Sequence, residues 1–244
     1  MRSFGKIILA AAAVLALSGA AAAGVYIEQQ NHMDAFTMMG QNSPEKNTID
    51  KIYMETGKMA MQGEGNDVIV RLDLKKMYIV DRAAKTYQVA DLPLQFPPEF
   101  AQMMSMMTFD VDVKKTGETR QVSGYNCEKV VLTLSGGMVN MKMTMTMWCT
   151  KDIKIPFGDY FEMSATMMSS NPSMKQMMDK MKSIDAGFPV ESEMAMEVMG
   201  SAMRGTTKLL KVENKPIPAA VFDPPAGFKS EPLDFMKMMQ KGGR

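Results

Sequence analysis

The sequence has little of the residue types on which most catalytic and metal sites depend. Among its 244 residues there are one histidine, one tryptophan and two cysteines, and aromatic residues make up 7% of the chain. A nucleophilic triad or a zinc site needs a histidine near its partners, and His32 lies far from both cysteines in sequence. The chain also lacks a nucleophile elbow, a phosphate-binding glycine loop and a metalloprotease helix motif. We therefore expect a protein that is not an enzyme and that has neither a cofactor nor a zinc site.

The sequence also has no excess of one charge. It carries 28 lysines and arginines against 27 aspartates and glutamates, a formal net charge of +1. It therefore has neither the basic surface that binds nucleic acid nor the polybasic segment that binds anionic lipid heads. We expect no nucleic-acid partner.

The N-terminal residues 1–23 have the pattern of a secretory signal. Two cations precede the apolar stretch Ile7–Leu17, and Ala21–Ala23 supply a small-residue cleavage site before Gly24. The whole apolar region covers about 17 residues, at the lower limit for a membrane span of about 20. No cysteine follows the cleavage site to carry a lipid anchor. We expect cleavage near Ala23 and a periplasmic or secreted protein without an integral membrane span.

The rest of the chain has no internal boundary. Residues 24–244 contain no glycine-, serine- or proline-rich linker and no repeat of fixed period. A chain of this length fits one domain with a large core. We predict a single domain over residues 24–244.

The two cysteines, Cys127 and Cys149, predict one disulfide in an exported protein, with a pair of buried thiols as the alternative. They do not form a C-x-x-C motif, and each lies in a predicted strand rather than at a helix N-terminus, which favours a structural bond over a redox centre. A bond that closes a loop of about 22 residues would stabilise the fold by about 3 kcal/mol.

Methionine, by contrast, is abundant, with 31 residues, and many of them are regularly spaced. The run MKMTMTMW places four at alternate positions, so on a strand their thioethers share one face: Met141, Met143, Met145 and Met147. The segment PSMKQMMDKM places another four at helical spacing: Met174, Met177, Met178 and Met181. Methionine is a soft and adaptable side chain, suited to a core or to a cavity that accommodates varied ligands.

Strand patterns dominate both ends of the sequence. In DVIVRLDLKK, apolar residues alternate with polar ones from Val68 to Leu74, which indicates a strand with a single buried face. The expected strands are 25–39, 48–61, 67–74, 77–81, 86–90, 108–114, 118–122, 127–135, 140–149, 190–199 and 206–212, and AVFDPPAGFK closes the sheet.

Helical patterns interrupt the strands. After two prolines, apolar residues recur at the i, i+3, i+4 and i+7 positions of a helix: Phe100, Met103, Met104 and Met107. A second helical region covers 157–183, within which Asn171-Pro172 opens a helix that ends at Ile184. A short helix is expected at 233–240. Helices set aside from a mainly antiparallel sheet predict an α+β fold.

The hairpin 127–149 has a predictable register. A loop at 136–139 pairs Leu134 with Met141, Leu132 with Met143 and Val130 with Met145, so that the aliphatic and methionine rows share a face. One β-bulge near the open end would bring Cys127 opposite Cys149.

Four segments resemble a family of exported bacterial proteins that is catalogued as a domain of unknown function and is similar to the LolA/LppX/RseB-like half-open β-barrels. They are KMYIVDRAAKTYQV, then TGETRQVSGYNCEKVVLTL with MTMTMWCTKDI, and AVFDPPAGFK. The resemblance covers about Ile52 to Lys229. The resemblance implies a curved antiparallel sheet around an apolar groove, with helices packed on or capping its concave face. In lipoprotein carriers of this fold the groove holds acyl chains, but fold analogy does not transfer the ligand.

The methionines allow three hypotheses. The first is an apolar groove that binds a lipid, a lipoprotein or a hydrophobic peptide. Its lining would come from the long hairpin (Val130, Leu132, Met141, Met143, Met145 and Met147), and its cover from the first helix (Phe100, Met103, Met104 and Met107). The second is Cu(I) binding by thioethers, since M-x-M also occurs at Met59/Met61 and Met194/Met196. The third is a methionine-rich core without a ligand.

Overall fold

The computed structural model describes residues 24–38, 40–98, 102, 108–137, 140–155 and 172–233. The predicted signal, most of the predicted helix around 100–107, the stretch 156–171 and residues 234–244 lie outside these ranges. Within the described part of the chain, no helix has the length and apolarity needed to cross a bilayer.

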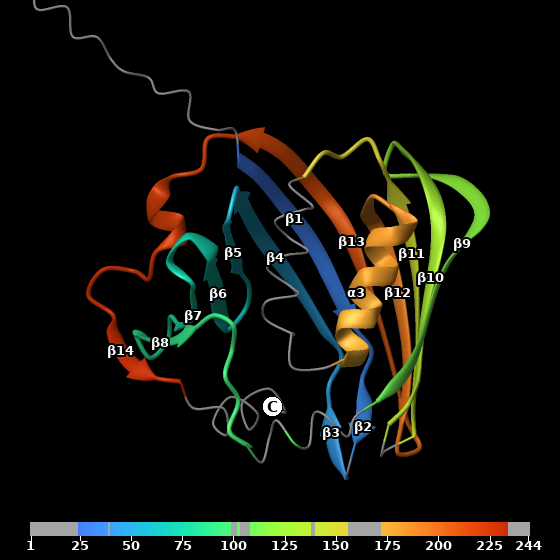
Figure 1. Cartoon of the computed structure of the whole chain (residues 1–244), viewed down its shortest axis with the longest axis horizontal. Coiled ribbons are helices and arrows are strands. Elements are labelled where there is room, and N and C mark those ends of the chain that lie inside the picture. The colour runs from blue at the N-terminus through green and yellow to red at the C-terminus, as the bar shows by residue number, and fades with distance from the viewer. Residues whose placement is uncertain are drawn as a thin grey trace, which may run out of the picture.

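The described strands form one large sheet and a small hairpin (Figure 1). The strand order in the 12-stranded sheet is β14-β8-β7-β6-β5-β4-β1-β13-β12-β11-β10-β9, and the β14–β8 ladder is its only parallel one. The small hairpin pairs β2 (Phe36–Met38) with β3 (Gln41–Ser43). In chain order the strands of the large sheet are β1 (Gly24–Met33), β4 (Lys46–Glu55), β5 (Lys58–Gln62), β6 (Asn66–Arg71), β7 (Lys76–Asp81), β8 (Thr86–Asp91), β9 (Phe109–Val122), β10 (Tyr125–Gly136), β11 (Met141–Thr150), β12 (Phe188–Val198), β13 (Ser201–Lys215) and β14 (Lys229–Pro232).

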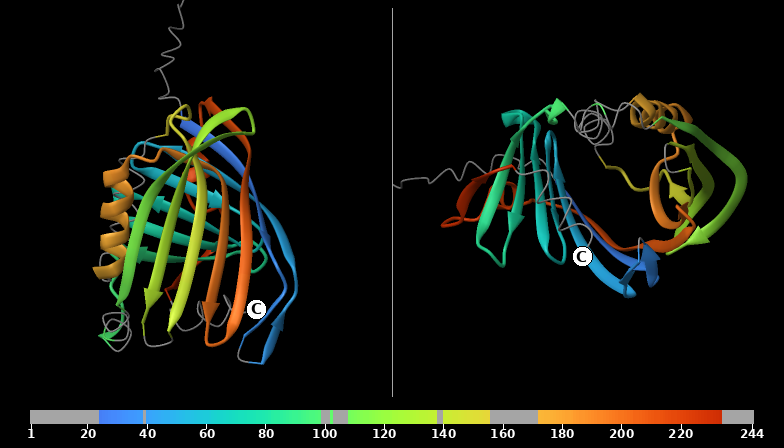
Figure 2. Two further views of the ribbon diagram at one scale, coloured as in Figure 1. Left: turned by 90° about the vertical axis from the view of Figure 1, so that its right-hand side faces the viewer. Right: turned by 90° about the horizontal axis from the view of Figure 1, so that it is seen from below.

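The large sheet is curved and open. The end-on view in Figure 2 shows it bent into a trough, with helix α3 (Pro172–Ile184) on the concave side beside β9. The edge strands β9 and β14 are not paired with each other, so the sheet does not close into a barrel. The structure is therefore α+β, dominated by a curved and mainly antiparallel sheet.

The helical spacing predicted for the segment PSMKQMMDKM is confirmed in α3. Met177, Met181 and Ile184 follow the i, i+4, i+7 pattern, and all three pack against the buried residues of β9, β10 and β11. Two polar contacts fix the helix to β9: the Phe109 N–H donates to Ser173 Oγ across 2.9 Å, and Lys180 Nζ donates to the Val111 carbonyl.

The hairpin of β10 and β11 has the predicted shared face but a different register. Leu134 pairs with Met143, Leu132 with Met145 and Val130 with Met147, two residues further along β11 than predicted. A shift of two residues keeps each side chain on its face. The turn begins one residue later than expected, at Gly137 with φ +74°, and the Asn140 N–H donates to the Gly137 carbonyl across 3.1 Å.

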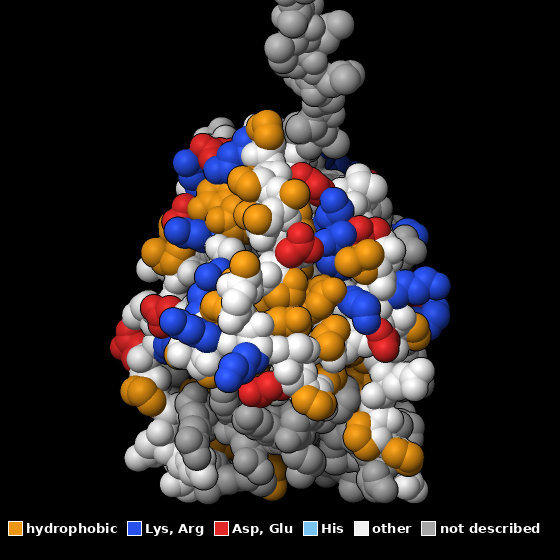
Figure 3. Space-filling view, turned by 90° about the vertical axis from the view of Figure 1, so that its left-hand side faces the viewer, with side chains coloured by type: hydrophobic (Ala, Val, Ile, Leu, Met, Phe, Trp, Pro, Cys, Tyr) orange, Lys and Arg blue, Asp and Glu red, His pale blue; other side chains and the backbone are white. Residues whose placement is uncertain are grey.

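The prediction of a single buried face is wrong for the half of the sheet that contains β5 to β8. Val70 belongs to an apolar cluster on the concave face, whereas its neighbour Ile69 packs on the convex face with Phe222. The chain after β13 covers the convex face there through the 3-10 helix η2 (Ala219–Phe222), at positions where AVFDPPAGFK was expected to be a strand. Arg71 holds this segment by donating to Asp223 Oδ1 across 2.6 Å. Figure 3 shows this side of the molecule, where hydrophobic side chains lie among charged ones.

One further strand prediction fails locally. The strand expected over 67–74 ends at Arg71, and Leu72–Leu74 form a 3-10 helix, η1, that ends with Lys75 in a left-handed conformation. Leu74 is therefore 48% exposed instead of lying on the buried face.

Candidate ligand site on the concave face

The methionines of several strands share the concave face of the sheet. Cross-strand pairing continues the row of β11 onto β12 and β13, so that Met143 lies beside Met196 and Met196 beside Met203. One row further along, Met145 pairs with Met194. Strand alternation also directs Met54, Met59 and Met61 of β4 and β5 to this face, because their neighbours in the ladders belong to the concave clusters.

At the β9 end of the sheet these methionines are packed into a core. Val130 is fully buried, and Leu132 and Met147 are also buried in the same cluster. The half-buried Met141, Met143 and Met145 pack against that cluster together with Met177, Met181 and Ile184 of α3. Helix α3 therefore fills the space above this part of the predicted lining. Phe100, Met103, Met104 and Met107, the predicted cover, lie outside the described residues.

A cavity opens on the concave face next to this core. Its volume is about 380 Å³. Met145 is the one member of the predicted lining that borders it, together with Met33 of β1 and Met194 of β12. The remaining lining is polar and comes from β1, β4, β12, β13 and the turn after β5: Asn31, His32, Lys46, Thr48, Asp50, Glu64, Ser192, Gly205, Thr206 and Thr207.

The polar side of the cavity is a connected hydrogen-bond network. Thr207 Oγ1 donates to Asn31 Oδ1 across 2.8 Å, and Asn31 Nδ2 donates to Asp50 Oδ2 across 2.8 Å. The other Asp50 oxygen lies against Gly63, where a Cβ atom would come within 2.5 Å of it. Removal from water raises the pKa of the Asp50 carboxyl, and the Asn31 hydrogen bond opposes that shift.

His32, at the rim of the same cavity, has both ring nitrogens engaged. Nδ1 lies 3.0 Å from Asn47 Oδ1 and Nε2 lies 2.8 Å from Asp34 Oδ1. These hydrogen bonds raise the pKa of the imidazole above its ordinary value of 6.5. Both nitrogens face an oxygen acceptor, so a metal ion could bind His32 only by displacing one of these hydrogen bonds.

The predicted disulfide is absent, and Cys127 and Cys149 are free, buried thiols. The β10–β11 ladder runs without the expected bulge, so the partner of Cys149 is Glu128. Cys127 lies one residue away from the position opposite Cys149. Cys127 packs with Trp148, whereas Cys149 packs with Val130 and Met147. Burial raises the pKa of both thiols, that of Cys149 to about 12.

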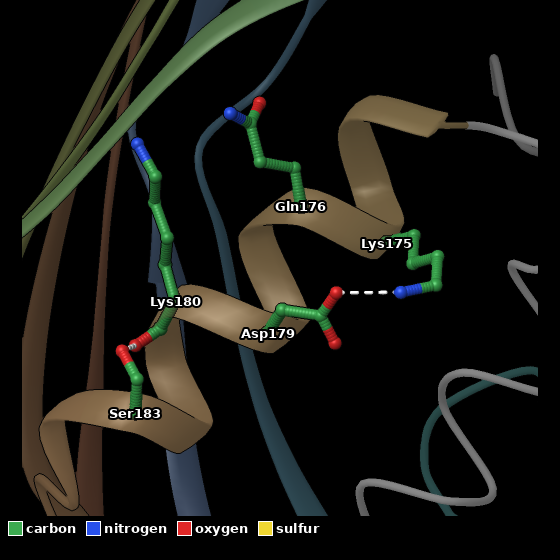
Figure 4. A pocket seen from close by; sticks show the side chains of 5 residues that line it. All are labelled: Lys175, Gln176, Asp179, Lys180 and Ser183. Atoms are coloured by element: carbon green, nitrogen blue, oxygen red, sulfur yellow. Dashed lines mark hydrogen bonds and ion pairs between the residues drawn. The ribbon is translucent and has the colours of Figure 1, made fainter.

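A second depression, on the solvent side of α3, is not a comparable site (Figure 4). All its lining residues belong to one helix face, where Lys175 forms an ion pair with Asp179 across 2.6 Å and Ser183 Oγ donates to the Lys180 carbonyl. A ligand there would contact a single exposed helix surface. In the described ranges no group of three histidine, cysteine, aspartate or glutamate side chains could hold a metal ion.

Sequence reasoning missed the polar half of the site. Alternation along β1 places Asn31 on the same concave face as the buried Ile27. The extra residue of the bulge at Glu28/Gln29 belongs to β13 and leaves the β1–β4 register unbroken. The partners of Asn31, which are Asp50 and Thr207, come from strands far away in sequence, and no local pattern brings the three side chains together. The M-x-M pair at Met194 was a usable signal, because alternation alone puts it on the face opposite its charged neighbours.

Comparison with known proteins gives one family. The family model described as "Domain of unknown function (DUF4412)" matches residues 32–228. No curated protein matches the chain.

Proposed function

The chain belongs to the DUF4412 family, a domain of unknown function, and we propose that it binds an apolar or lipidated ligand on the concave face of its sheet without catalysing a reaction. The observation that carries the proposal is the cavity of about 380 Å³, which is bordered by Met33, Met145 and Met194 on one side and by the Asn31–Asp50 network on the other. This volume falls within the range of about 300–1,000 Å³ typical of small-molecule sites.

The composition of the cavity favours an amphiphile. Thioethers from Met33, Met145 and Met194 offer an apolar and adaptable surface for an acyl chain or a similar group. The Asn31–Asp50 network and the Thr207 hydroxyl offer hydrogen-bonding positions at the other side. An apolar chain would lie along the methionines while its polar end meets the network. A lipid, an acylated protein segment or a hydrophobic peptide with a polar terminus has this character.

The proposed architecture is a half-open barrel with a helical cover, as in the LolA/LppX/RseB-like proteins. In support of it, the sheet is curved, and α3 lies against β9 on the concave side. The proposed location is the periplasm or the medium, based on the signal-like residues 1–23.

A fluorescent fatty acid whose emission rises in apolar surroundings is a direct probe of this function. We expect saturable binding by the protein, and a loss of affinity of at least about tenfold in Met194→Asp, because a carboxylate in the cavity must be desolvated by the bound chain. Met199→Asp is the matched control: Met199 is 60% exposed at the turn between β12 and β13, and its replacement should leave binding unchanged.

Two checks keep this experiment decisive. Met194→Gln replaces the thioether by a neutral polar group, and it substitutes for Met194→Asp if the charged variant does not fold. Met194→Leu keeps the apolar surface and should retain binding. Absence of saturable binding, or equal binding by the aspartate variants of Met194 and Met199, would overturn the proposal.

A further inference from the structure

We propose that the thioethers of Met33, Met145 and Met194 form a binding site for one soft monovalent metal ion, Cu(I). This site is a separate property of the same face and does not depend on the binding of an apolar ligand. It rests on the way in which three strands bring these side chains to the border of one cavity.

Cross-strand pairing brings the first two thioethers together. Met145 of β11 and Met194 of β12 are direct partners in the ladder. Directly opposite residues in an antiparallel pair have Cβ atoms about 4.5–5.5 Å apart, closer than neighbours on the same face of one strand. Two flexible side chains that start at this separation can direct both sulfurs at one ion.

A glycine allows the third thioether to join them. The other ladder partner of Met194 is Gly205 of β13, and the partner of Gly205 on β1 is Met33. A Cβ atom on Gly205 would lie 3.2 Å from Met33 Cε and 3.4 Å from Met33 Sδ. The end of the Met33 side chain therefore lies across Gly205, on the side of β1 that faces Met194. All three methionines border the same cavity of about 380 Å³.

The chemistry of the lining selects the ion. A thioether is a soft, neutral ligand that suits Cu(I) and offers little to hard cations such as Mg²⁺ or Ca²⁺. Among the described residues of this lining, the imidazole is already engaged at both nitrogens, and neither cysteine is present. At a pH where His32 is neutral, Asp50 and Glu64 carry two negative charges at the cavity against the one positive charge of Lys46, which favours a bound cation.

The next methionine row provides an internal control. Met143, Met196 and Met203 repeat the same residue type across β11, β12 and β13, but none of them lines the cavity. Met203 is also only 7% exposed. If methionine content alone decided the affinity for a soft ion, the two rows would bind it equally well. The proposed site requires that the ion binds at Met145 and Met194 and not at Met143, Met196 and Met203.

Titration with Ag(I), a redox-stable substitute for Cu(I), tests the site in the full chain carrying Cys127→Ala and Cys149→Ala, because free thiols also bind Ag(I). In protein labelled with ¹³C at the methionine methyl groups, we expect the signals of Met33, Met145 and Met194 to shift together and saturate at one equivalent, with each signal assigned from its Met→Leu variant. Shifts that saturate first at Met143, Met196 and Met203, or no saturable shift at one equivalent, would overturn the proposal.

Competition with a chromophoric Cu(I) chelator under anaerobic conditions gives the affinity. The background for this measurement carries Cys127→Ala and Cys149→Ala, because thiolates also bind Cu(I). Removal of a residue that only hydrogen-bonds to a metal ligand already costs about 10–100-fold in metal affinity, so each replacement of a proposed ligand by leucine should weaken binding by at least about tenfold. Met196→Leu should leave it unchanged, and an equal loss in Met196→Leu and Met194→Leu would contradict the assignment.

Gly205→Ala tests the position of Met33 without removing a sulfur. The added methyl group would meet the Met33 side chain and also the His32 carbonyl oxygen at 2.9 Å, so thermal unfolding must be compared in parallel. Cu(I) affinity should fall toward that of Met33→Leu. The triple leucine variant of Met33, Met145 and Met194 should lose Cu(I) and retain the fatty-acid probe. If the wild-type protein did not bind the fatty-acid probe but did bind Cu(I), the proposed function would be contradicted and the metal site would not.

Discussion

Asn31 and Asp50 lie on adjacent strands of the concave face and are joined by a hydrogen bond of 2.8 Å from Asn31 Nδ2 to Asp50 Oδ2. Thr207 continues the network from the other side by donating to Asn31 Oδ1. The three side chains form a polar strip beside the methionines that border the same cavity. A carboxylate in such surroundings affects both stability and ligand preference.

Asp50→Asn should raise the melting temperature at neutral pH. Desolvation raises the pKa of the Asp50 carboxyl in the folded protein, so the ionised group opposes folding, and stability is lost as the pH rises through that pKa. The asparagine removes the charge and can still accept from Asn31. The difference between the two proteins should vanish at a pH well below the ordinary carboxyl pKa, where Asp50 is protonated in both states. Thermal unfolding followed by circular dichroism across this pH range measures it, and a lower melting temperature for the variant at neutral pH would contradict the prediction.

The only histidine should titrate above its ordinary pKa of 6.5. Asn47 Oδ1 and Asp34 Oδ1 are both acceptors, so the imidazolium, which donates from both nitrogens, is favoured. The resulting stabilisation is fully present below the unfolded-state pKa and is lost as the pH rises through the raised pKa. NMR titration of the single His32 signal gives the pKa, and His32→Gln should abolish the corresponding step in stability. A value at or below 6.5 would show that these contacts do not persist in solution.

Val130→Ala should destabilise the fold by about 2 kcal/mol, since it removes two buried methyl groups and leaves a cavity under α3. Val130 is fully buried between β9 and β11, whereas Ile49 is 47% exposed. Ile49→Ala is therefore the control and should change stability by less than about 0.5 kcal/mol. Urea denaturation of the two variants distinguishes them, and equal effects would mean that the β9–β11 cluster is not a packed core.

Cys127 and Cys149 should behave as two free and protected thiols. Burial raises the pKa of both thiols, so few thiolates exist near neutral pH and the native protein should resist alkylation. In denaturant without a reductant, mass spectrometry should detect two alkyl groups per chain. If alkylation required a reductant, the two cysteines would be joined in solution and the strands around Glu128 would have to rearrange.

The sequence was informative where a pattern repeats and uninformative where a single turn or a segment distant in sequence decides the outcome. Alternation from Met141 to Met147 predicted a shared face, and the structure has that face. The register was wrong by two residues because the turn starts at Gly137, whose left-handed backbone the residue pattern does not locate. The polar strip was missed because Asn31, Asp50 and Thr207 come from three strands whose pairing no local pattern reveals. The burial of Ile69 depends on η2, a segment more than a hundred residues away, which no local pattern could reveal.

Native mass spectrometry of the protein purified from the cells that make it tests ligand binding on the concave face most directly. Wild type and Met194→Asp are prepared side by side and compared for masses added to the chain. We expect a dissociable organic ligand of lipid or acyl character on wild type, and a much smaller fraction of it on Met194→Asp. Two bare proteins, or the same organic ligand at equal occupancy on both, would contradict the account.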